Sequence, residues 1–129
     1  MQQTAVSATP FDLVGGRDVV GQIVERFYDL LEQDPAYAEL RALHAPDLAP
    51  MRKSLTGFLA AWLGGPRDWF DEHPGLCMMS AHRGVAMTPQ VGRQWANAMS
   101  RAITESPVEP VLAAKMAEAL SDLAIRMAA

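Results

Sequence analysis

Residues 18–32 read DVVGQIVERFYDLLE, and their apolar side chains recur with a period near 3.6 residues. This spacing is typical of an amphipathic α-helix, which buries one face and exposes the other. Asp18 is the expected N-cap of the helix, and Asp34-Pro35 is expected to end it. The stripe that this helix would bury consists of Val20, Ile23, Val24, Phe27, Leu30 and Leu31.

Proline and glycine residues divide the rest of the chain into further helices. After a break at residues 44–46 we expect a helix that Asp47 caps and that the GGP sequence at residues 64–66 ends. Thr88 is the expected N-cap of the next long helix, since its hydroxyl can accept a hydrogen bond from a free backbone N–H group. The last helix is expected to follow Ser106-Pro107 and to continue to the end of the chain.

Two shorter helices are expected over residues 36–43 and about 78–84, and no segment alternates apolar and polar residues as a β-strand does. The predicted fold class is therefore all-α. With 129 residues, of which 50% are hydrophobic and 20% are charged, the chain has the length and composition of one globular domain. We assign residues 1–10 to an N-terminal extension and residues 11–129 to that domain.

The charge, the apolar content and the single cysteine exclude several classes of protein. A net charge of −4 without a basic run argues against nucleic-acid binding. No stretch reaches the ~18 uninterrupted apolar residues of a membrane span, and the first ten residues lack the pattern of a signal peptide. We therefore expect a soluble cytoplasmic protein that binds neither membrane nor nucleic acid. Cys77 alone forms no internal disulfide.

Familiar catalytic motifs are absent from the sequence. It contains no Gly-rich phosphate loop, no nucleophile elbow and no close-spaced pair of His or Cys residues that could hold a metal. The three histidines, His44, His73 and His82, lie in separate segments. Composition and periodicity alone therefore predict only a helical domain, and evidence for a function must come from the order of particular residues.

Five short motifs supply that evidence. Four of them are FDLVGG at residues 11–16, RFYDL at 26–30, LRALH at 40–44 and FLAAWLGGP at 58–66. The fifth is a histidine, His82, thirteen positions before Trp95. In this order the motifs resemble those of the truncated haemoglobins, especially group II, over about residues 11–127. The resemblance implies a globin-like 2-over-2 helical sandwich around haem b.

The resemblance makes His82 the ligand of the haem iron. Neutral imidazole is a good iron ligand, although a lone histidine without this context is more often structural. The run SAHRGV at residues 80–85 departs from the Arg-His-x-Pro-Phe pattern that the family often shows, so the contacts around the histidine do not transfer. The candidate haem contacts near it are Met79, Val85 and Met87, with Arg83, or else Arg52 or Lys53, as the partner of a propionate.

On the opposite side of the haem, the resemblance implies hydrogen-bond donors to a bound gas. Tyr28 is similar to the family's distal tyrosine, and Trp95 to its group II distal tryptophan. His44 falls where the family has Tyr, Phe or His, and it could add a second donor or be an exposed loop histidine. Each aromatic residue has a structural alternative, since an aromatic side chain on a helix stripe is commonly part of the core.

The remaining candidates are expected to line the haem pocket. Leu55 matches an apolar pocket residue, and Phe58 is similar to the aromatic residue that packs on the haem edge. Met51 falls where group II members commonly carry a small side chain, so we expect it to obstruct a short path for ligands. Trp69 and Phe70 are expected to close the haem edge.

The resemblance implies a haem protein that binds dioxygen, carbon monoxide and nitric oxide. It also implies nitric oxide dioxygenase or peroxidase-type activity, for which a separate reductase would supply electrons; we assign no catalytic residues. The protein is expected to be a monomer or a homodimer. The alternative is a cofactor-free helical interaction or dimerisation module, in which the eight methionines form an adaptable surface.

Overall fold

The computed structural model describes residues 8–72 and 87–128, and all the regular structure in these two ranges is helical. The all-α prediction is therefore confirmed for the described residues. Four helices are long: α2 (Gly16–Gln33), α4 (Ala49–Trp62), α7 (Pro89–Thr104) and α8 (Pro110–Met127). The short elements are α1 (Pro10–Val14), the 3-10 helix η1 (Pro35–Tyr37), α3 (Ala38–Ala42) and α5 (Asp68–Glu72). The short helix predicted near residues 78–84 lies outside the described residues.

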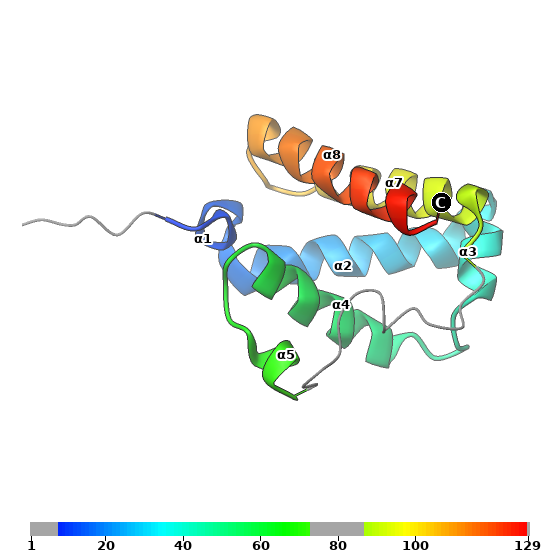
Figure 1. The fold of residues 1–129 in the computed structure, drawn as a ribbon, viewed down its shortest axis with the longest axis horizontal. Coiled ribbons are helices and arrows are strands. Elements are labelled where there is room, and N and C mark those ends of the chain that lie inside the picture. Colours follow the sequence, from blue (N-terminus) through cyan, green and yellow to red (C-terminus); the bar gives the residue numbers. More distant parts are fainter. Residues whose placement is uncertain (1–7, 73–86, 129) are drawn as a thin grey trace, which may run out of the picture.

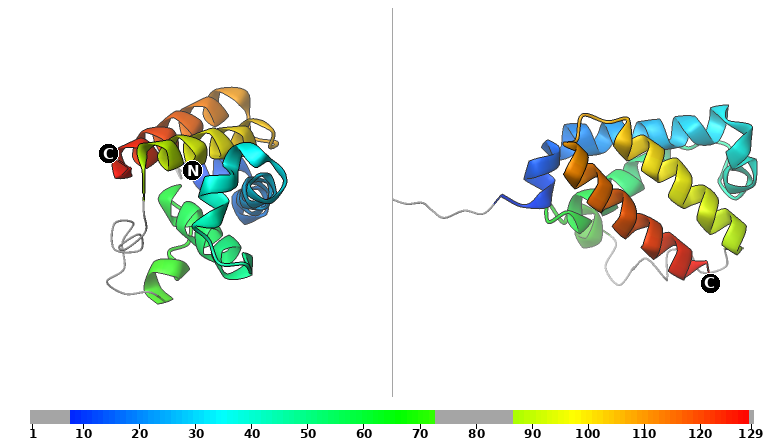
Figure 2. Two further views of the ribbon diagram at one scale, coloured as in Figure 1. Left: turned by 90° about the vertical axis from the view of Figure 1, so that its right-hand side faces the viewer. Right: turned by 90° about the horizontal axis from the view of Figure 1, so that it is seen from above.

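The long helices form two packed pairs (Figures 1 and 2). Helices α7 and α8 lie side by side and are joined by residues 105–109, while α4 packs against α2. Helix α2 also packs on α7 and so connects the two pairs. The predicted stripe of α2 is buried in full, and Tyr28 is buried beside it. Its apolar face therefore forms the centre of the core.

The start of α2 differs from the prediction. Its N-cap is Gly15 (φ +115°), followed by Gly16 (φ +73°), and the predicted cap Asp18 lies inside the first turn. Such positive φ angles favour glycine, so the pair allows a sharp junction between α1 and α2. Helix α1 itself was not predicted. It starts with a reciprocal capping box, in which the side chains of Thr9 and Asp12 each accept a backbone N–H from the other residue.

Helix α4 begins and ends close to the predicted positions. Its N-cap is Leu48 rather than Asp47, although the Asp47 carboxylate accepts a hydrogen bond from the Ala49 N–H group at 3.0 Å. At the other end, a Cβ atom added to Gly65 would lie 2.5 Å from Cγ of the Phe11 ring. The glycine therefore allows α1 to pack closely on the end of α4.

The predicted Thr88 cap of α7 is confirmed, since its hydroxyl accepts the Val91 N–H group at 3.1 Å. Helix α5, by contrast, was not predicted. It packs on α4 at Gly57, where an added Cβ atom would lie 2.7 Å from the Cβ of Trp69. This close approach places Trp69 against α4.

Within the described ranges, no helix combines the length and the apolar character needed to cross a membrane.

Candidate functional site

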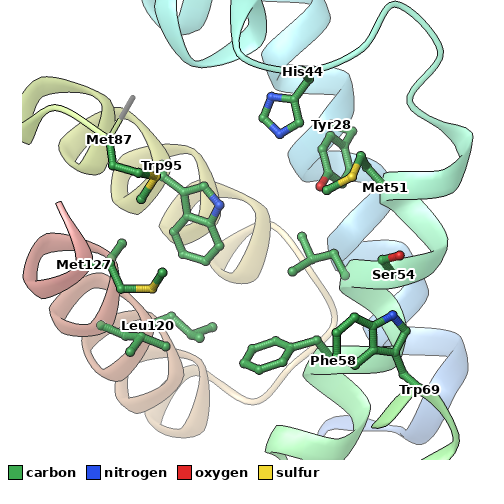
Figure 3. A pocket seen from close by; sticks show the side chains of 13 residues that line it. Tyr28, His44, Met51, Ser54, Phe58, Trp69, Met87, Trp95, Leu120 and Met127 are labelled. Carbon is green, nitrogen blue, oxygen red and sulfur yellow. The ribbon is translucent and has the colours of Figure 1, made fainter. Parts of the chain in front are cut away.

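An apolar pocket lies between the helices of the two pairs (Figure 3). It encloses about 830 Å³ of free space, part of which is open to solvent. The lining residues are Tyr28, His44, Met51, Ser54, Leu55, Phe58, Trp69, Met87, Trp95, Leu120, Leu123, Ala124 and Met127.

Most of the predicted site residues that the structure describes lie together in this pocket. They are Tyr28, His44, Met51, Leu55, Phe58, Trp69, Met87 and Trp95. Phe70 is not among the lining residues, but its ring lies 6.0 Å from that of Phe58 and 5.0 Å from that of Trp69. It therefore supports the wall from behind. The other predicted residues, Met79, His82, Arg83 and Val85, lie outside the described residues.

Tyr28 is the most deeply buried polar residue of the pocket, with 2% of its surface exposed. Its ring meets the His44 ring edge to face, with centroids 5.8 Å apart, and meets Phe27 in the same way at 4.9 Å. Burial raises the pKa of the Tyr28 phenol well above its usual value, and the positive charge of Arg52 only partly offsets this. The phenol is therefore neutral near pH 7 and keeps an O–H group that can donate a hydrogen bond.

His44 lies in the loop after α3, beside Tyr28 (Figure 3). Its Nδ1 atom lies 2.9 Å from the carbonyl oxygen of Leu40. Because a carbonyl only accepts, Nδ1 carries the proton in this hydrogen bond, and Nε2 of the neutral ring is an acceptor. A hydrogen bond from Nε2 to a ligand would require both ring nitrogens to be protonated, so the role of His44, a second donor or a loop histidine, stays a prediction.

Trp95 faces the pocket from α7, opposite Tyr28 (Figure 3). Its ring packs on Phe27 of α2, with centroids 5.4 Å apart and a tilt of 57°. The indole N–H group is a donor only. Met51 of α4 lies at the edge of the pocket, since it lines the pocket and yet 39% of its surface is exposed. That Met51 restricts access to the pocket stays a prediction.

Sequence reasoning missed five lining residues. Four of them, Leu120, Leu123, Ala124 and Met127, come from α8, whose apolar stripe resembles an ordinary core stripe. The fifth, Ser54, is a polar residue one turn from both Met51 and Phe58 on the apolar face of α4. Among the missed residues, only Ser54 carried a signal in the sequence: a polar residue within an apolar stripe could have indicated that this face of α4 borders a pocket rather than the core.

The two basic residues of α4 do not line this pocket. Arg52 turns toward α2, where its guanidinium donates to the side chains of Glu25, Asp29 and Glu32. Lys53 lines a separate surface cavity. Because its guanidinium is held by these carboxylates, Arg52 is poorly placed to be the propionate partner that the sequence offered as an alternative.

The pocket fits a flat, mostly apolar group such as haem. Its walls are aromatic rings, leucines and methionines, which suit the faces of a porphyrin. Its buried phenol and partly buried indole can act as hydrogen-bond donors at one end, where a small polar ligand could lie. The lining thus combines a large apolar surface with a few convergent polar groups.

Comparisons with known proteins point to one family. The sequence profile of the bacterial-like globins matches residues 9–129. The chain is 24% identical over 100 residues to the group 2 truncated hemoglobin YjbI of Bacillus subtilis. This matched region covers 78% of this chain and 73% of that protein.

Solved structures of similar proteins superpose closely. The group II 2-on-2 hemoglobin of Agrobacterium tumefaciens has a TM-score of 0.89 and 25% identity, covering 97% of each chain. The cold-adapted truncated hemoglobin of Pseudoalteromonas haloplanktis has a TM-score of 0.88 and 26% identity, covering 93% of this chain and 97% of that one.

Proposed function

The chain belongs to the bacterial-like globin family, and we propose that its apolar pocket holds haem b and binds dioxygen, carbon monoxide and nitric oxide. Its fold is the 2-on-2 fold of the group II truncated haemoglobins, and this family implies haem and the binding of diatomic gases. One observation carries the assignment to this pocket: residues from α2, α4, α7 and α8, distant in sequence, line a single apolar cavity that contains a neutral, buried phenol.

We assign the haem contacts by the chemistry of the lining residues. Haem supplies an iron that takes one protein nitrogen and leaves another position for a diatomic gas. We propose that Phe58 of α4 and Leu123 and Met127 of α8 pack against the porphyrin, because they offer apolar surface from both sides of the pocket. His82, outside the described residues, is the proposed iron ligand.

The hydrogen-bond donors are proposed to select among gases. Tyr28 would donate its O–H group, and Trp95 its indole N–H group, to a ligand that gains negative charge on binding. Such a donor stabilises dioxygen more than carbon monoxide, because bound dioxygen carries more negative charge. His44, whose Nδ1 is bound to Leu40, would orient the Tyr28 ring rather than donate to the ligand.

The pocket also bears on the alternative of a cofactor-free interaction module. That hypothesis needs methionines on the surface, but of those that the structure describes, Met99 and Met116 are buried in the core. Met87 and Met127 line the pocket, and Met51 lies at its edge. The placement of these side chains therefore favours a cofactor pocket over an adaptable docking surface.

Absorption spectra of the purified protein in its ferric, ferrous and carbonmonoxy states test the proposal. We expect an intense band near the violet end of the visible range that shifts on reduction and again with carbon monoxide. The His82→Ala variant is expected to lose stoichiometric haem, or to keep a weak and altered site, whereas His44→Ala should retain haem.

If the His82→Ala variant keeps wild-type spectra, another residue is the iron ligand, and His44 is the next candidate. A colourless protein that takes up no haemin would contradict the proposed cofactor. The nitric oxide dioxygenase and peroxidase activities that the resemblance implies stay predictions, and a separate reductase would have to supply their electrons.

A further inference from the structure

One arginine of α4 binds three carboxylates of α2 directly behind Tyr28. Nη1 of Arg52 donates to the carboxylate of Glu25 and, at 3.2 Å, to the Glu25 carbonyl. Its Nη2 donates to Asp29 and to Glu32, each at 3.2 Å. The same guanidinium carbon lies 5.6 Å from the centre of the Tyr28 ring. Arg52 therefore holds α4 against α2 at the turn that carries Tyr28.

A second arginine fixes the loop that carries His44. Arg41 donates to the carbonyl of Ala45 at 3.1 Å and to that of Pro46 at 3.0 Å. Its Nη2 also lies 3.9 Å from the second oxygen of the Glu32 carboxylate. Because these two carbonyls follow His44 directly, Arg41 restrains the loop on the C-terminal side of His44.

Glu32 thus contacts both arginines, through a hydrogen bond from Arg52 at 3.2 Å and a longer ion pair with Arg41 at 3.9 Å. We propose that Glu32, by bridging Arg41 and Arg52, is a positioning residue that sets Tyr28 and His44 relative to each other at the end of the pocket. The inference rests on the proposed function, because it concerns the polar end of the pocket where a gas would bind. It adds a charged network outside the pocket to the residues that line it.

The exposure of the network indicates where its effect is to be found. The Glu32 side chain is 45% exposed, and ion pairs between exposed groups contribute little to stability. The two Nη atoms of Arg41, like those of Arg52, donate to different partners, and the planar guanidinium therefore fixes the direction of these partners as well as the distance to them. We therefore expect loss of Glu32 to change the geometry at Tyr28 and His44 more than it changes the unfolding equilibrium.

The test is the Glu32→Gln variant of the haem-loaded protein, with Glu118→Gln on the exposed face of α8 as the matched control. In the diamagnetic ferrous carbonmonoxy form, NMR measures the nuclear Overhauser effect between the Tyr28 and His44 rings. We expect this effect to weaken in Glu32→Gln and oxygen release to become about twofold to tenfold faster, the range expected for one weakened hydrogen bond. The thermal unfolding midpoint should stay close to that of the wild type.

A double-mutant cycle then tests the bridge itself. If Glu32 acts through Arg41, the Glu32→Gln and Arg41→Gln effects on oxygen release should be clearly less than additive. Additive effects, or a wild-type ring contact and release rate in Glu32→Gln, would overturn the proposal. If the wild-type protein takes up no haem, the proposed function fails, and the same ring contact measured in the haem-free protein still decides whether Glu32 positions the two side chains.

Discussion

Tyr28 combines two properties at the scale of a single residue: it is almost fully buried, and it keeps a proton that it can donate. Burial raises the pKa of its phenol, so the O–H group persists over the whole range in which a globin operates. A hydrogen bond from this group to a ligand that gains negative charge contributes about 1.5–3 kcal/mol, which is more than a hydrogen bond between neutral groups contributes.

We predict that Tyr28→Phe increases the rate of oxygen release by about tenfold or more, since the ligand loses this hydrogen bond. Stopped-flow measurements on the reduced protein check the rate, and carbon monoxide release should change less. Tyr37→Phe is the matched control, because the buried Tyr37 hydroxyl binds Asn97 and Arg101 instead of lining the pocket. An unchanged rate in Tyr28→Phe, or an equal change in Tyr37→Phe, would contradict the assigned donor.

The sequence predicted eight of the residues that line the pocket and missed five, and it did not show how their polar groups are used. Tyr28 and Trp95 were predicted from their place in the family motifs, and both line the cavity. The protonated nitrogen of His44 depends on the Leu40 carbonyl, which only the folded loop brings within 2.9 Å. Likewise, the three partners of Arg52 lie on another helix, and side-chain pairing between helices leaves no local pattern in the sequence.

At the scale of the elements, α5 depends on a glycine in α4. Helix α5 is only five residues long, which is too short for an isolated helix to be stable in water. Its position depends on packing at Gly57, where an added Cβ atom would come within 2.7 Å of the Trp69 Cβ atom. This contact holds Trp69 in the wall of the pocket.

We predict that Gly57→Ala lowers the free energy of unfolding by about 1 kcal/mol, because the cost of overpacking exceeds the gain in helix propensity. Gly21→Ala in α2 is the matched control, since nothing lies within 4 Å of an added Cβ atom there. The control should be more stable than the wild type by up to about 1 kcal/mol. Urea unfolding of both variants checks the two signs, and a stabilised Gly57→Ala protein would contradict the close contact.

The four long helices were predicted because each carries an apolar stripe with a period near 3.6, which is a property of the local sequence. Helix α5 was missed because it depends on a contact with α4, a tertiary effect that no local window contains. Helix α1 was missed although its Thr9 and Asp12 capping box was visible in the sequence. Its five residues are too few to show a helical period, so the capping signal alone predicted no helix.

At the scale of the whole molecule, the pocket exists only because two helix pairs pack with a gap that side chains do not fill. The predicted 2-on-2 fold is confirmed, and the fold implies where such a gap lies. The sequence could not show that Leu123 and Met127 face this gap, because an apolar residue has the same spacing whether it faces the core or a cofactor. The central claim is that haem occupies this space.

Titration of the haem-free protein with haemin tests that claim most directly when two variants of α8 are compared. Leu123 lines the pocket, whereas Ile125, two residues further along, is 49% exposed. We predict a sharp end point at one haemin per chain for the wild type and for Ile125→Asp. Leu123→Asp should lose this end point while keeping its helical circular dichroism, because a charged carboxylate is costly to bury against an apolar ligand. Equal haemin binding by the helical Leu123→Asp and Ile125→Asp proteins would contradict the account.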